Sequence, residues 1–133
     1  MSDDGMVTLA SAFSVKETID RLVAIVTSKG MTVFSRLDHS ANAQKVGMPL
    51  RPTVLLIFGN AKAGTPLMQA KQTIGIDLPL KALAWEDVDG KVWVTANDPT
   101  WLARRHGLGA ESEATIAAMR AGLIAATRGA AGA

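Results

Sequence analysis

The feature that most constrains the fold is an unbroken apolar run near the middle of the chain. Residues 53–58 read Thr-Val-Leu-Leu-Ile-Phe. They lack the alternation of apolar and polar side chains that marks a strand with one face in water. The run therefore predicts an interior strand of a sheet, with both of its faces covered.

Local signals on either side of this run predict both helices and strands. Ser14 and Glu17 form a capping box ahead of a helix whose apolar residues have helical spacing, and Gly30 ends that helix in the left-handed region. The other elements expected are strands at 7–13 and 31–38, a short helix at 39–47 capped by Ser40 or Asn42, a hairpin at 80–96, and helices at 99–106 and 112–128.

This order of elements predicts an α+β fold, with an antiparallel sheet and helices packed on one face. It contains a hairpin and lacks the regular alternation of strands and helices that builds parallel sheets. A chain of 133 residues is long enough to bury a core without disulfides. We expect residues 1–6 to be a flexible N-terminus, 7–128 a single α+β domain and 129–133 a frayed C-terminus.

The hairpin at 80–96 sets the position of two tryptophans. It turns around Asp89-Gly90, a pair suited to positive φ. Connections of two or of four residues both place Trp85 in the core, with Val94, and Trp93 on the opposite face. An exposed Trp93 on a sheet with free edges predicts a homodimer.

Charge and composition exclude several classes of function. Fourteen basic and twelve acidic side chains give a net charge of +2, and the basic ones are scattered, so nucleic-acid binding is not expected. The chain has no cysteine and two distant histidines, so we expect no metal and no cofactor. The polar start resembles no signal peptide, and no apolar run is long enough to span a bilayer. We therefore expect a cytoplasmic protein without a membrane partner.

The loop after the apolar run carries the main candidate binding residues. Gly59 and Gly64 have the spacing of a phosphate-binding P-loop, but Thr65 stands where that motif needs lysine. If Thr65 caps a helix, a small anion would bind at its N-terminus beside Lys62, with Asn60 orienting it. The alternative is that both glycines supply positive φ and Asn60 braces its own turn.

Two titratable residues outside this loop are further candidates. His39 follows Asp38 at the end of a strand, an arrangement found for general bases and metal ligands. Neighbouring strand residues point to opposite faces, however, which favours a surface or capping histidine. Asp77 lies among apolar residues and needs a partner. It either caps the amides of its own turn or pairs with Lys62 to shape a pocket.

An ordered series of motifs resembles domain of unknown function family 302. The segments that carry the likeness are 58–68, Ile76-Asp77-Leu78-Pro79-Leu80, Trp85-Glu86, Gly90-Lys91-Val92-Trp93 and Asp38-His39-Ser40. The likeness covers roughly residues 11–106, although Ala61 stands where the family usually has proline. It implies a compact domain resembling the TATA-binding-protein-like β-α-β(4)-α arrangement, and it implies no activity.

Three functions remain open from the sequence. The first is an uncharacterised soluble module that binds a small anionic ligand, with these candidate residues: His39, Asn60, Lys62, Gly64, Thr65 and Asp77. The second is an enzyme with His39 as acid–base and Lys62 with Asn60 as an electrostatic clamp. The third is a structural homodimeric interaction module. No residue is assigned as catalytic.

Overall fold

The computed structural model of the chain describes residues 4–133. Residues 1–3, which are half of the expected flexible N-terminus, lie outside the described residues. The elements follow the order β1 (Met6–Ser11), α1 (Val15–Ser28), β2 (Thr32–Asp38), α2 (His39–Lys45), β3 (Thr53–Gly59), α3 (Ala61–Ala70), the 3₁₀ turn η1 (Gln72–Ile76), β4 (Leu80–Glu86), β5 (Val92–Asn97), α4 (Pro99–Arg105), the 3₁₀ turn η2 (Ala110–Ser112) and α5 (Glu113–Ala131).

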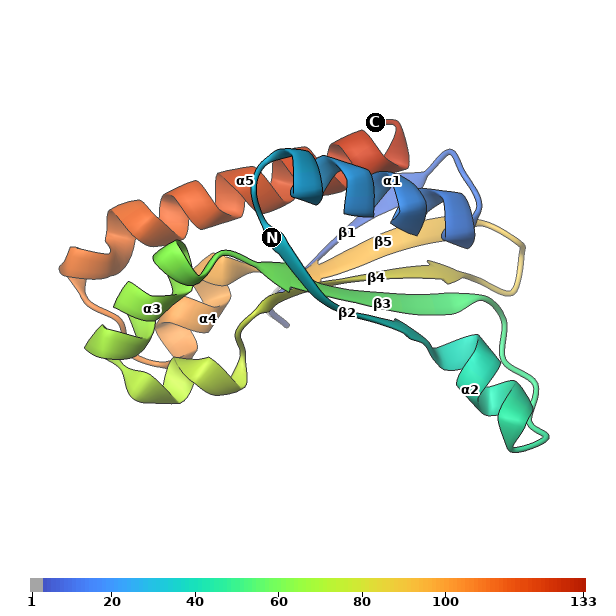
Figure 1. Cartoon of the computed structure of the whole chain (residues 1–133), viewed down its shortest axis with the longest axis horizontal. Coiled ribbons are helices and arrows are strands. Elements are labelled where there is room, and N and C mark those ends of the chain that lie inside the picture. Colours follow the sequence, from blue (N-terminus) through green and yellow to red (C-terminus); the bar gives the residue numbers. More distant parts are fainter. Residues whose placement is uncertain (1–3) are drawn as a thin grey trace.

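The five strands form one sheet in the order β1-β5-β4-β3-β2, and each neighbouring pair is antiparallel. Helices α1 and α5 lie against each other across one face of this sheet (Figure 1). With α2, α3 and α4 as insertions, the order of elements is the expected β-α-β(4)-α arrangement. The α+β fold with helices packed on one face is confirmed.

The core fills the space between the covered face of the sheet and these two helices. Helix α1 contributes Ile19, Leu22 and Val26, and β3 contributes Leu56 and Phe58; all five side chains have 0% exposure. Burying a side chain of this size stabilises the fold by about 1.5–3 kcal/mol. The neighbouring strands present small residues on the same face: Ala82, Ala84 and Ala96.

The opposite face of the sheet is open in the part of the chain that the structure describes (Figure 1). Leu55 and Leu83, which pair between β3 and β4, are half-buried there. Trp85 and Trp93 stack on this face with their ring centroids 6.3 Å apart. Strand β3 is interior, as expected, but helices cover only one of its two faces.

The hairpin between β4 and β5 has a different register from the one predicted. Trp85 pairs directly with Trp93, because the connection has five residues, 87–91. An odd number shifts the pairing by one residue, so Trp85 shares the open face with Trp93 and is not in the core. Asp87 holds this loop: its carboxylate accepts from two loop amides and from Trp93 Nε1, each at 2.9 Å. Trp93 is half-buried against Trp85 and is not the lone exposed ring that the homodimer prediction assumed; the homodimer itself stays a prediction.

Two helix starts lie where their capping residues predict. Ser14 Oγ accepts a hydrogen bond from the Glu17 amide at 3.1 Å. Asp98 Oδ1 accepts one from the Thr100 amide at 2.9 Å, and Pro99 occupies the first turn. At both positions the capping residue alone was sufficient to predict where the helix begins.

Both ends of the described chain are more ordered than expected. β1 begins at Met6, and the Gly5 carbonyl accepts a hydrogen bond from the Asp98 amide at 2.8 Å. Helix α5 continues to Ala131, and Ala130 and Ala131 are buried where fraying was expected. The packed domain therefore extends beyond the predicted 7–128.

Candidate functional site

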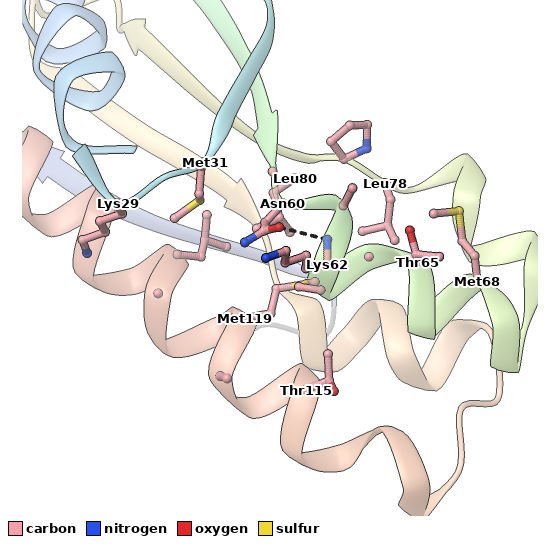
Figure 2. A pocket seen from close by; sticks show the side chains of 18 of the residues that line it. Lys29, Met31, Asn60, Lys62, Thr65, Met68, Leu78, Leu80, Thr115 and Met119 are labelled. Carbon is pink, nitrogen blue, oxygen red and sulfur yellow. Dashed lines mark hydrogen bonds between the residues drawn. The ribbon is translucent and has the colours of Figure 1, made fainter. Parts of the chain in front are cut away.

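A groove of about 710 Å³ lies between α3 and α5, next to the ends of β3 and β4 (Figure 2). Its size falls within the range of about 300–1,000 Å³ that small-molecule sites occupy. Most of the wall is apolar, and the larger apolar side chains that line it are Met31, Phe34, Met68, Leu78, Leu80, Met119 and Leu123.

The start of α3 forms one side of this groove. Asn60 follows β3 directly, and its Oδ1 accepts a hydrogen bond from the Lys62 amide at 2.9 Å. The helix therefore begins at Ala61, four residues before the predicted start at Thr65. Thr65 lies inside α3 and offers no free first-turn amide, so the predicted anion site at a Thr65 N-terminus does not form.

Of the two glycines in this segment, Gly59 serves close packing and Gly64 does not require it. Neither Gly59 nor Gly64 has a positive φ, so the prediction that they supply left-handed turns is also wrong. A Cβ on Gly64 would lie 3.6 Å from Leu78 Cδ1, and one on Gly59 would lie 3.3 Å from Pro79 Cβ. Gly59 therefore lets the end of β3 approach Pro79 closely, whereas the distance at Gly64 is an ordinary van der Waals contact.

Among the described residues 4–133, the charged side chains that line the groove are two cations, Lys29 and Lys62, and no aspartate or glutamate lines it. In the region 4–133 neither ammonium group has a hydrogen bond or an ion pair. Figure 2 shows the side chains of Asn60 and Lys62 beside each other, with Lys29 at the edge. Four of the six predicted binding residues line this groove: Asn60, Lys62, Gly64 and Thr65.

His39 lies elsewhere. It is the first residue of α2 and is exposed. Its neighbour Asp38 pairs with Val54, at the opposite end of β3 from Asn60. Six residues of strand at about 3.3 Å each separate these ends by about 20 Å. His39 therefore shares no site with Asn60 and Lys62, and the enzyme hypothesis built on those three residues is wrong.

Asp77 has partners that the sequence analysis did not identify. His106 Nε2 lies 2.5 Å from Asp77 Oδ2, and Arg105 Nη1 lies 3.1 Å from Oδ1. His106 Nδ1 is 3.1 Å from Thr73 Oγ1, and the histidine side chain is only 8% exposed. This cluster ties η1 to the end of α4, and its members do not line the groove. The predicted pair of Asp77 with Lys62 is absent among the described residues.

The family comparison gives a clear result. The model of the family described as domain of unknown function DUF302 matches residues 7–126. The chain belongs to this family. A solved structure described as an uncharacterized conserved protein DUF302 from Bacillus stearothermophilus is similar over 95% of this chain and 98% of that one, with a TM-score of 0.84 and 20% identity. At that identity the likeness supports the shared fold alone.

Two relatives of this DUF302 chain are named as ion channels. This chain is 56% identical over 130 residues to Fluoride-specific ion channel FluC 1 of Brucella suis biovar 1. The match covers 98% of this chain and 51% of that protein. The corresponding protein of Brucella abortus biovar 1 has the same identity, with 48% covered. The chain thus spans about half the length of the curated relatives it matches.

These names correct the functional expectations drawn from the sequence. An uncharacterised soluble module, cytoplasmic and without a membrane partner, was expected. Relatives that match almost the whole chain are instead named as fluoride-specific ion channels, which are membrane proteins. Among residues 4–133, no helix combines the length and the apolar character needed to cross a membrane.

Proposed function

We propose that this DUF302 chain acts as an accessory domain of a fluoride-specific ion channel, next to the part that conducts the ion. The observation that carries the proposal is the 56% identity across 98% of the chain to half of a protein with that name. Such identity over a whole domain supports a role retained together with the channel.

The interior of the domain supports an accessory role over a conducting one. The core between the sheet and its two helices is filled by apolar side chains. A dehydrated fluoride ion needs hydrogen-bond donors to replace its water. Within the described residues, no buried side-chain nitrogen or oxygen lacks a hydrogen-bond partner, so the core holds no free donor for the ion.

The fold also supports the view that this domain is structurally separate from the other half of the channel relatives. The similar Bacillus stearothermophilus chain is covered over 98% of its length, so the same β-α-β(4)-α domain accounts for nearly all of that chain.

The test uses the Brucella suis relative in four forms: whole, without the segment that matches this chain, with that segment replaced by this chain, and with it replaced by the Bacillus stearothermophilus domain. Each form is reconstituted in liposomes, and fluoride and chloride efflux are measured. We expect the shortened form to remain selective for fluoride with an altered efflux rate. This chain is expected to restore the original rate, and the fold-matched Bacillus domain is expected not to.

Two results would overturn the proposal. One is a shortened protein whose efflux rate equals that of the whole protein. The other is fluoride efflux from liposomes that contain this chain alone, since that would place the conducting path within it.

A further inference from the structure

We propose that the groove between α3 and α5 binds a single-chain amphiphile with an anionic headgroup, such as an alkyl phosphate or a fatty acid. This inference goes beyond the channel association and does not depend on it, because it concerns what the isolated domain binds. Three independent features of the groove support it.

The first feature is the deep apolar wall. Met31 lines the groove from just before β2, Met68 from α3 and Met119 from α5, and Leu78 lies between them (Figure 2). Methionine side chains are flexible and polarisable, so they adapt to a chain without a fixed shape. A small inorganic anion would leave this wall unused.

The second feature is the open part of the groove along α5, which we call the slot. Ala114, Ala118 and Gly122 recur every four residues, so they share one face of the helix, and all three line the groove. A Cβ built on Gly122 would meet no heavy atom within 4 Å. The groove is therefore open beside Gly122 and has room there for an extended alkyl chain.

The third feature is the charge at the rim. The ammonium groups of Lys29 and Lys62 have no ion pair in the described part of the chain, and no carboxylate lines the groove. The Asn60 side chain lies beside Lys62 and keeps its NH₂ group for a ligand, since only its oxygen is used as the helix cap. Two unpaired cations next to an apolar wall match a headgroup of negative charge on an apolar tail.

The test is calorimetric titration of the purified chain with dodecyl phosphate, held below the concentration at which it forms micelles. Inorganic phosphate and dodecanol are titrated in parallel, because they carry the headgroup and the tail separately. We expect saturable binding of one dodecyl phosphate per chain, at least tenfold weaker binding of dodecanol, and no binding of inorganic phosphate.

Two variants locate the site. Gly122→Phe fills the slot and should abolish binding, whereas Ala121→Phe adds the same ring on an exposed position outside the groove and should not. Lys29→Gln/Lys62→Gln should weaken dodecyl phosphate binding at least tenfold and leave dodecanol unchanged. Lys45→Gln/Lys71→Gln is the control with the same change of charge outside the groove.

Several outcomes would overturn the proposal. Unchanged binding to a folded Gly122→Phe protein would place the ligand elsewhere. Equal binding of dodecanol and dodecyl phosphate would remove the role of the lysines. Saturable binding of inorganic phosphate alone would show a simple anion site. Failure of this titration leaves the liposome test of the channel association unaffected.

Discussion

Helices α2 and α3 begin in the same way and end in different surroundings. Each follows a strand of the sheet without a linker, and each is capped by an Asx residue. Asp38 Oδ1 accepts from the Ala41 amide at 2.9 Å, and Asn60 Oδ1 accepts from the Lys62 amide at the same distance. Both starts thus have an Asx cap, which accepts from the amide three residues ahead at Asp38 and two residues ahead at Asn60.

The difference lies in what packs against each helix. Helix α2 has no buried residue, and Val46, just after it, is 71% exposed. Helix α3 buries Leu67, which has 1% exposure and packs with Ile74 and Ile116. The cap therefore sets where a helix begins, whereas contacts with distant segments decide whether it builds a pocket.

The largest expected effect compares one apolar side chain near α2 with one in α3. Leu67→Ala should lower the free energy of unfolding by about 2–5 kcal/mol, because it leaves a cavity in the cluster under α3. Val46→Ala should change it by less than about 0.5 kcal/mol, because the side chain is exposed. Urea denaturation measures both. Similar losses for the two variants would show that the ends of the sheet do not differ.

A smaller effect concerns the cluster that closes the α3 end. His106→Ala removes the partner of Asp77 Oδ2 and should cost about 1–3 kcal/mol, since the histidine side chain is largely buried and hydrogen-bonded to a carboxylate. Dodecyl phosphate binding should persist, because His106 does not line the groove. Loss of binding in a fully folded His106→Ala protein would contradict this separation of the cluster from the site.

The two helix caps should differ in their dependence on pH. Asp38→Ala and Asn60→Ala should each cost about 1 kcal/mol at pH 7, as typical cap losses do. The Ser40 hydroxyl, followed by the Ala41 amide, lowers the pKa of the Asp38 carboxyl. Because the folded-state pKa is depressed, its contribution is complete above the unfolded pKa of about 3.9 and disappears as the pH falls through the folded pKa.

Denaturation of both cap variants between pH 7 and pH 3 measures that difference. The cost of Asp38→Ala should shrink as the solution becomes more acidic, while the cost of Asn60→Ala should stay constant. A constant cost for both would mean that the Asp38 charge contributes nothing to its cap.

The smallest expected effect is a gain in stability at the groove. Gly122→Ala should raise the free energy of unfolding by about 0.5–1 kcal/mol, because alanine restricts the unfolded chain and its Cβ would meet open space. A thermal melt measures the change. A loss of stability would mean that the slot beside α5 is narrower than the structure describes.

Short-range signals predicted most of the fold. The caps at Ser14 and Asp98 were found because each depends on residues within three positions. The hairpin register was predicted wrongly for a local reason too. Asp87 organises a connection of five residues, whereas the sequence analysis considered only connections of two and four residues. A single residue of difference moved Trp85 to the open face.

The site was predicted only in part, because its parts come from distant segments. Asn60 and Lys62 were identified from the abrupt change after the apolar run. Lys29, Met119 and Gly122 line the same groove, but they lie some thirty to sixty residues away and carry no local mark of a site. The pairing of Asp77 with His106, 29 residues later, was hidden for the same reason.

The most direct test of the account is a map of where dodecyl phosphate binds, obtained from the backbone amide resonances of the chain. We predict that the largest shifts occur at Lys62 and Met119 and at Gly122 on α5, while α2, with the same kind of cap, shows none. Largest shifts on α2 or on the open face around Trp85 and Trp93 would contradict the claim that the α3 end of the sheet forms the binding site.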